Sequence, residues 1–240
     1  MKSMQNWASK FAIALALAAT QAAATPPQVI TVKDALFART DDTLFLLRTV
    51  QDNHGMHSIQ QTDTLVVSRS LIGGDDRGFQ IVARVIDHGT FTEPRVELLP
   101  VAAPINPHAL FADFGAWPIA SYAPRTDTYT TFTQDGLTLD FYGKIYSLSL
   151  NDITLRMENT LQATRAAAPM RRVGTALSGP DEFDPALFDL LRDCAVTETQ
   201  LLYDLDEDPA LAQLTCGVDN DTRSVTLWFV VPRVAPEVAQ

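Results

Sequence analysis

The sequence is poor in lysine, and this shortage limits the reactions that a lysine amine could catalyse and the anionic partners that the protein could bind. Lysine occurs four times in 240 residues, and two of the four, Lys2 and Lys10, lie at the extreme N-terminus. Lys33 and Lys144 are therefore the main candidates for Schiff-base chemistry, which requires a lysine amine. With 18 basic against 29 acidic residues, the formal net charge is −11. This acidity argues against nucleic acids and anionic membrane surfaces as partners, because both attract basic patches.

The common hydrolase and nucleotide-binding motifs are also missing. The chain contains no G-x-S-x-G, H-E-x-x-H or S-x-x-K pattern, and no glycine-rich loop followed by Lys-Ser or Lys-Thr. Serine hydrolases of the elbow type, zinc proteases and P-loop enzymes are therefore excluded, and no cofactor is expected. A hydrolase that uses two carboxylates is not excluded, because such a pair leaves no sequence motif.

No hydrophobic run is long enough to span a bilayer, which needs about 20 apolar residues. The N-terminus instead has the pattern of a secretory signal: basic residues, the apolar stretch 11–20, and small residues at 22–24. We predict cleavage after Ala24 and export of residues 25–240 as a soluble, periplasmic or secreted protein with no membrane span. Cleavage removes two lysines and leaves 16 basic against 29 acidic residues.

Hydrophobic alternation between turn residues predicts a chain dominated by antiparallel hairpins. The two strands of one predicted hairpin are joined by a turn that contains Gly73-Gly74 and Gly78. The strands of a predicted meander are joined by turns at Asp135-Gly136 and Asn151-Asp152. Gly143 is expected to mark a bulge within its middle strand. The predicted strands are 65–72, 79–87, 95–99, 127–133, 137–150, 153–158, 214–218 and 224–231.

A few short helices are predicted between these strands. Thr31 caps a predicted helix over 31–39, Asn106-Pro107 opens a second, and Asp184-Pro185 opens a third. Residues 43–51 form a compact apolar run that fits either a buried strand or a buried helix. The expected fold class is α+β, mostly antiparallel hairpins, in a single domain over 25–240. Residues 159–182 are expected to form a loop or linker before a C-terminal part, 183–240.

Cys194 and Cys216 are the only cysteines in the chain. An even number of cysteines in an exported protein predicts a disulfide, because the compartment outside the cytoplasm is oxidising. The disulfide would crosslink the C-terminal part, 183–240, and leave no thiol for catalysis.

The segment Asn53-His54-Gly55-Met56-His57 combines imidazole and thioether donors, which suit copper and, for the imidazoles, zinc. The alternative is a polar turn, which Asn53 and Gly55 favour. The turn interpretation is preferred, because the cluster lacks a second soft ligand. His54, Met56 and His57 therefore remain weak candidates for a metal site.

Two classes of function remain. The preferred hypothesis is a non-catalytic envelope module that binds a protein or a small ligand through a surface of its β-sheet. The alternative is a two-carboxylate hydrolase acting on glycans, with Trp117 and Tyr122 contacting the substrate. The module is preferred because no spacing in the sequence assembles a catalytic set, so catalytic residues are unknown and catalysis is not expected.

Overall fold

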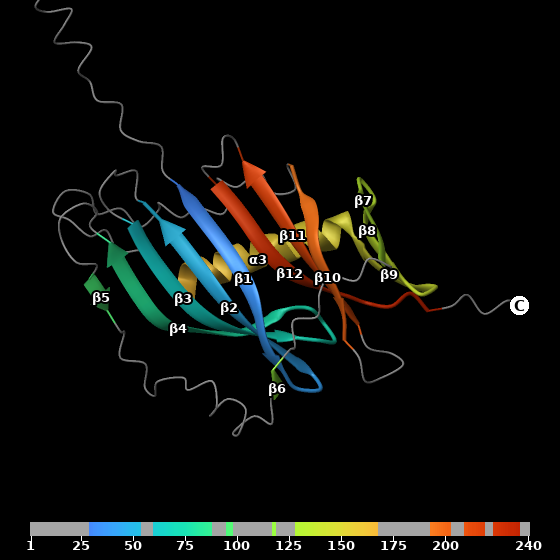
Figure 1. Ribbon diagram of the computed structural model, residues 1–240, viewed down its shortest axis with the longest axis horizontal. Coiled ribbons are helices and arrows are strands. Elements are labelled where there is room, and N and C mark those ends of the chain that lie inside the picture. Colours follow the sequence, from blue (N-terminus) through green and yellow to red (C-terminus); the bar gives the residue numbers. More distant parts are fainter. Residues whose placement is uncertain are drawn as a thin grey trace, which may run out of the picture.

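The computed structural model describes residues 29–53, 60–87, 95–97, 117–118, 128–167, 193–202, 209–218 and 223–235. These residues form two β-sheets and one helix, and Figure 1 shows their arrangement. The elements are β1 (Ile30–Arg39), β2 (Thr43–Asp52), β3 (Gln60–Ser70), β4 (Asp76–Asp87), β5 (Arg95–Glu97), β6 (Trp117–Pro118), β7 (Thr128–Thr133), β8 (Gly136–Phe141), β9 (Lys144–Ser149), α3 (Leu150–Ala167), β10 (Ala195–Leu201), β11 (Ala210–Val218) and β12 (Arg223–Val231).

The large sheet has the strand order β10-β11-β12-β1-β2-β3-β4-β5, and the short β6 pairs with β1. Most neighbours are antiparallel hairpins, as expected for strands that follow one another in the chain. The exception is β1, which pairs in parallel with β12 from Ile30 to Lys33. The first and last strands of the described part of the chain, β1 and β12, therefore lie side by side within the sheet.

The small sheet has the order β7-β8-β9 and is connected to the large one through the residues after β12. Ser147 N–H donates to the carbonyl of Pro232, and Val234 N–H donates to the carbonyl of Ile145. A continuous path of paired strands therefore runs from β10 through β11, β12 and β9 to β8 and β7. β10 and β7 are the two ends of this path.

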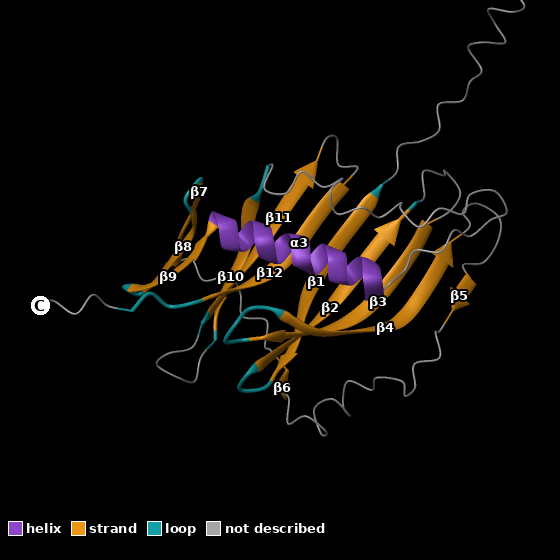
Figure 2. Cartoon of the chain, turned by 180° about the vertical axis from the view of Figure 1, so that it is seen from behind, coloured by secondary structure: helices purple, strands orange, loops and turns teal. Residues whose placement is uncertain are grey.

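The core lies between α3 and one face of the large sheet, which α3 crosses (Figure 2). Every second residue of a strand points toward the helix. In β1 these are the buried residues Ile30, Val32 and Asp34. The helix buries residues of one stripe: Ile153, Met157, Thr160, Leu161 and Thr164. These positions recur at three- and four-residue spacing, which places them on a single helical face.

The predicted fold class is wrong in its helical part, because the described residues are predominantly β with one helix. Residues 31–39 form β1 and not a helix. Their burial alternates with a period of two: Asp34 is buried, whereas Lys33 and Ala35 are exposed. Thr31 as a cap and Asp34 in the first turn favoured a helix in the sequence, but a buried partner on β2, Arg48, neutralises the carboxylate of Asp34.

The predicted strand at 153–158 is also wrong, because these residues belong to α3. Ser149 caps this helix: the N–H of Asp152 donates to Ser149 Oγ, and that hydroxyl donates to the Asp152 carboxylate, at 3.1 and 2.6 Å. Asn151 and Asp152 therefore form the first turn of a helix and not a hairpin turn.

The predicted strand at 137–150 is two strands, β8 and β9. Tyr142 and Gly143 both have positive φ values, 56° and 80°, as in a tight two-residue hairpin turn. Gly143 N–H also donates to Asp140 Oδ1 at 2.7 Å, which closes the turn. The expected bulge at Gly143 is therefore a turn between two strands.

Other predicted elements are confirmed. β3 and β4 form the predicted hairpin, β5, β7, β11 and β12 lie where strands were predicted, and 43–51 lies within a strand, β2. Residues 159–167, expected in a loop, are the C-terminal half of α3. The predicted signal segment 1–24, the helix after Asn106, the remaining linker 168–182 and most of the helix after Asp184 lie outside the described residues.

Candidate functional site: a groove between two strand edges

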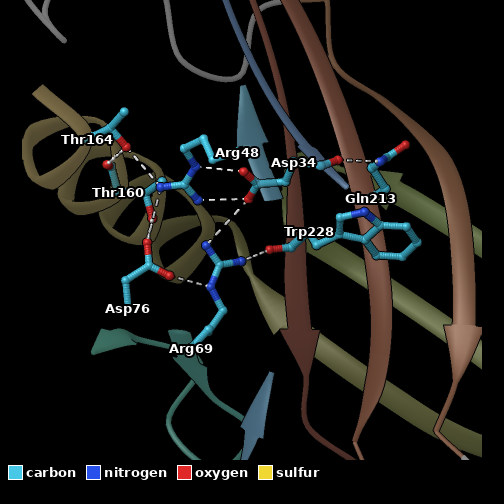
Figure 3. A network of polar contacts seen from close by, with 8 residues as sticks. All are labelled: Asp34, Arg48, Arg69, Asp76, Thr160, Thr164, Gln213 and Trp228. Atoms are coloured by element: carbon cyan, nitrogen blue, oxygen red, sulfur yellow. Dashed lines mark hydrogen bonds and ion pairs between the residues drawn. The ribbon is translucent and has the colours of Figure 1, made fainter. Parts of the chain in front are cut away.

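Arg48 on β2 is the centre of a buried charged network between the sheet and α3 (Figure 3). Its Nε and Nη2 donate to the two carboxylate oxygens of Asp34 on β1, at 2.6 and 2.8 Å. Its Nη1 donates to Thr164 Oγ1 of α3 at 2.9 Å and lies 3.4 Å from Asp76 Oδ2. Both Arg48 and Asp34 have side chains that are 0% exposed. A two-pronged arginine–carboxylate pair of this kind is the strong form of an ion pair.

Arg69 on β3 completes the network from the next strand. Its Nε donates to Asp76 Oδ1 at 2.6 Å, and its Nη2 lies 3.8 Å from Asp34 Oδ2. Thr160 of α3 donates its hydroxyl to Asp76 Oδ2 at 3.1 Å. Two arginines and two aspartates therefore balance their charges, and two threonines connect them to the helix. This network fixes the position of α3 on the sheet and leaves neither carboxylate available as a base.

Two arginines also bind the backbone of β12 where it separates from β1. The parallel ladder ends at Lys33, so the following carbonyls of β12 on that side have no strand partner. The carbonyl of Trp228 accepts from Arg69, and the carbonyl of Val230 accepts from Arg156 of α3 at 3.0 Å. Buried carbonyls require such partners. The two arginines therefore allow β12 to separate from β1 without leaving the carbonyls of Trp228 and Val230 unpaired.

A second buried pair lies near the start of β3. Arg84 donates from Nε and Nη2 to the two oxygens of Asp63, at 2.6 and 2.7 Å. Gln61 donates to the same carboxylate at 2.9 Å. All three side chains are buried. Asp63, like Asp34 and Asp76, is thus held by an arginine, and these described buried aspartates act as structural counter-charges.

Stability should depend on pH through Asp76. Burial raises the pKa of its carboxyl, but the charges of Arg69 and Arg48 and the hydrogen bonds from Arg69 and Thr160 outweigh it and lower the pKa below the usual 3.8. A lowered folded-state pKa adds stability that is fully present above the unfolded value and is lost as pH falls through the folded value. We expect unfolding free energy, measured in urea between pH 7 and pH 2, to fall below about pH 4.

Asp76→Asn is the matched variant for this prediction. It should be less stable than the wild type at neutral pH, and the difference should shrink as the medium is acidified. Equal pH dependence in the two proteins would show that Asp76 does not contribute to acid sensitivity.

The described part of the chain also contains a groove between β7 and β10, the two ends of the strand path. It has a volume of about 350 Å³ and is lined by Thr130, Phe132, Val196, Thr197, Glu198 and Thr199. Four consecutive residues of β10 line it, so its wall is the edge of that strand and not one face alone. Glu198 is the one charged residue among the six.

The wall formed by β10 is shaped by a bulge. The pairing of β10 with β11 shifts between Val196 and Glu198, which leaves Thr197 without an opposing residue. Thr197 Oγ1 lies 2.8 Å from Gln213 Oε1 and 3.3 Å from Thr215 Oγ1, so this hydroxyl is held by β11. Glu198 has no comparable hydrogen bond or ion pair to another described residue. Its carboxylate is therefore available to a ligand in the groove.

Trp117, the one described residue among those proposed from the sequence as metal ligands or substrate contacts, is not among the six residues that line this groove. Trp117 lies in β6 and pairs with Arg39 of β1. His54, Met56, His57 and Tyr122 lie outside the described residues, so the preferred turn at the histidines stays a prediction and the metal site stays its weaker alternative. Among the residues that the structure does describe, no group of histidine, cysteine, aspartate and glutamate side chains is positioned to hold a metal ion.

The disulfide between Cys194 and Cys216 is confirmed, with a Cα–Cα distance of 4.0 Å. Cys194 directly precedes β10 and Cys216 lies in β11. The bridge therefore ties one end of the groove's β10 wall to its neighbouring strand. In the described ranges, no helix has the length and apolar character needed to cross a membrane.

Comparisons with known proteins add no functional assignment. Neither a family model, nor a curated protein, nor a solved structure matches this chain.

Proposed function

We propose that this chain is a non-catalytic binding module of the cell envelope that accepts an extended segment of a partner protein at the edge of β10. The observation that carries the proposal is the groove between β7 and β10. β10 and β7 are both terminal strands of their sheets in the described part. An extended chain can add to such an edge through backbone hydrogen bonds, a common mode of peptide recognition. The disulfide is consistent with a location outside the cytoplasm.

The size of the groove limits the contact to a short segment. One residue of an extended strand occupies roughly 160 Å³, from a 3.3 Å rise, a 4.8 Å strand spacing and a 10 Å layer spacing. A volume of about 350 Å³ therefore holds about two residues. The remaining contact would come from the edge of β10, which extends over Ala195–Leu201. Small contacts of this kind are typical of transient interactions.

The positions of the described carboxylates support binding over catalysis. The carboxylates of Asp34, Asp63 and Asp76 are each held by an arginine. Among the described residues that line the groove, Glu198 is the single carboxylate, whereas glycoside hydrolysis requires a pair about 5 to 10 Å apart. The two-carboxylate hydrolase therefore gains no support from the described residues.

A pair of arginine substitutions on β7 tests the proposal. Thr130 lines the groove, and its neighbour Thr131 is exposed on the opposite face of the strand. Hexapeptides selected from a random display library on the purified, oxidised protein serve as probes. We expect Thr130→Arg to weaken their binding at least about tenfold, because the long side chain fills the groove and pairs with Glu198. Thr131→Arg should stay within about twofold of the wild type.

Fluorescence anisotropy with the labelled peptides measures these affinities. The proposal is wrong if no peptide is enriched over background, or if the selected peptides bind Thr130→Arg as tightly as Thr131→Arg. Circular dichroism and thermal unfolding of both variants establish that each remains folded.

A further inference from the structure

We infer that the groove selects a partner segment carrying a lysine or arginine side chain, which pairs with Glu198. This inference rests on the proposed function and names the chemistry of the segment that would occupy the groove. It concerns the side chain that enters the groove, in addition to the backbone pairing along β10.

The first support is the state of the Glu198 carboxylate. Glu198 is partly buried in the groove, and it makes no hydrogen bond or ion pair with any other described residue. A half-buried carboxylate of this kind attracts a cation that enters beside it, because the two carry opposite charges. The other five described lining residues are uncharged, so none of these five competes for that cation.

The second support is the arrangement of apolar and polar groups around Glu198. Phe132 and Val196 offer apolar surface, and Thr130 and Thr199 offer hydroxyls that have no hydrogen bond within the described part of the chain. Lysine and arginine side chains combine an apolar stem with a cationic head. Their stem can pack on the Phe132 ring while the head reaches Glu198, and a cation near an aromatic ring gains further attraction.

Charge also discriminates between possible occupants. The chain carries a formal net charge of −11, so long-range attraction favours basic segments. A second copy of this chain is disfavoured, because like-charged molecules would meet and β10 itself would bring a second Glu198 to the interface.

Selection from the random hexapeptide library on three proteins tests this inference. The proteins are the wild type, Glu198→Gln, and the control Glu158→Gln, which removes the same charge from an exposed position on α3. We expect lysine or arginine to be enriched at one peptide position with the wild type and with Glu158→Gln. With Glu198→Gln this enrichment should disappear.

A double-mutant cycle on the best peptide gives the size of the interaction. Replacing its basic residue by norleucine should weaken binding to the wild type about fivefold, near the upper limit for a partly exposed ion pair. The same replacement should leave binding to Glu198→Gln unchanged. General attraction to an acidic protein would instead affect both proteins alike.

The outcomes separate this inference from the proposed function. Peptides that are enriched and blocked by Thr130→Arg, but show no basic preference or one that survives Glu198→Gln, would overturn the inference alone. Failure to enrich any peptide on the wild type would overturn both. Concentration-dependent dimerisation that Thr130→Arg abolishes would identify a second copy as the occupant, and the basic segment would then be the wrong choice.

Discussion

Replacing Arg48 with methionine is expected to destabilise the fold by about 3 to 5 kcal/mol. Arg48 is fully buried and donates to Asp34, with Thr164 of α3 and Asp76 as further partners. Methionine fills much of the volume but removes the charge. Asp34 then keeps a buried carboxylate whose remaining cation, Arg69, lies 3.8 Å away. The cost comes from this stranded charge, since buried carboxylates require close counter-charges.

Arg77→Met provides the matched control. Arg77 forms an ion pair with Asp42 at 3.5 Å, but the two side chains are 48% and 61% exposed. Exposed pairs contribute about 0 to 1 kcal/mol, so this variant should stay close to the wild type in urea unfolding. Similar losses for the two variants would contradict the structural importance assigned to the buried network.

Loss of the disulfide is the second large effect. Cys194 and Cys216 close a loop with a sequence separation of 22, and the chain-entropy model assigns such a bridge about 3 kcal/mol. We expect the double variant Cys194→Ala, Cys216→Ala to lose roughly this amount in urea unfolding. Because Cys194 directly precedes β10, the groove wall should also loosen, and the selected peptides should bind this variant more weakly.

Reductant separates the effect of the bridge from that of the substitutions. Adding a thiol reductant should lower the unfolding midpoint of the wild type and leave that of the double variant unchanged. A wild-type midpoint that does not respond to complete reduction would refute a stabilising role for the bridge.

The sequence predicted much of the β architecture, because its signals are local. The turn residues around Gly73-Gly74 identified the β3–β4 hairpin, and alternating apolar residues identified β8. The turn residues 219–222 placed β12 as an apolar strand after them. The cysteine pair followed from number and compartment alone. The hairpin and strand predictions depend on residues that are close together in the chain. The disulfide prediction needed no such proximity, because two cysteines allow only one pairing.

The errors arose where distant partners decide the local structure. Asp34 weakens the strand pattern of β1 until Arg48 is known to neutralise it. Ile153 and Leu155 alternate like a strand, but Ser149 caps a helix there, and that helix buries Ile153 against the sheet. The serine-x-x-aspartate pattern ending at Asp152 was a local signal that would have identified this start.

The candidate site could not be assembled from the sequence. Phe132 and Glu198 lie far apart in the chain, and they line the same groove because the residues after β12 pair with β9 and bring β7 toward β10. No motif marks either residue. A groove of this type depends on the order of strands in space, which one sequence does not specify.

Hydrogen exchange of the backbone amides, with and without a selected peptide, shows whether the peptide adds to the edge of β10. Strand addition at β10 predicts that the peptide slows exchange of edge-facing amides within 196–199, because new backbone hydrogen bonds form there. It also predicts that Thr130→Arg removes this protection. Peptide-induced protection confined to other strands, with 196–199 unchanged, would show that the peptide does not add to β10.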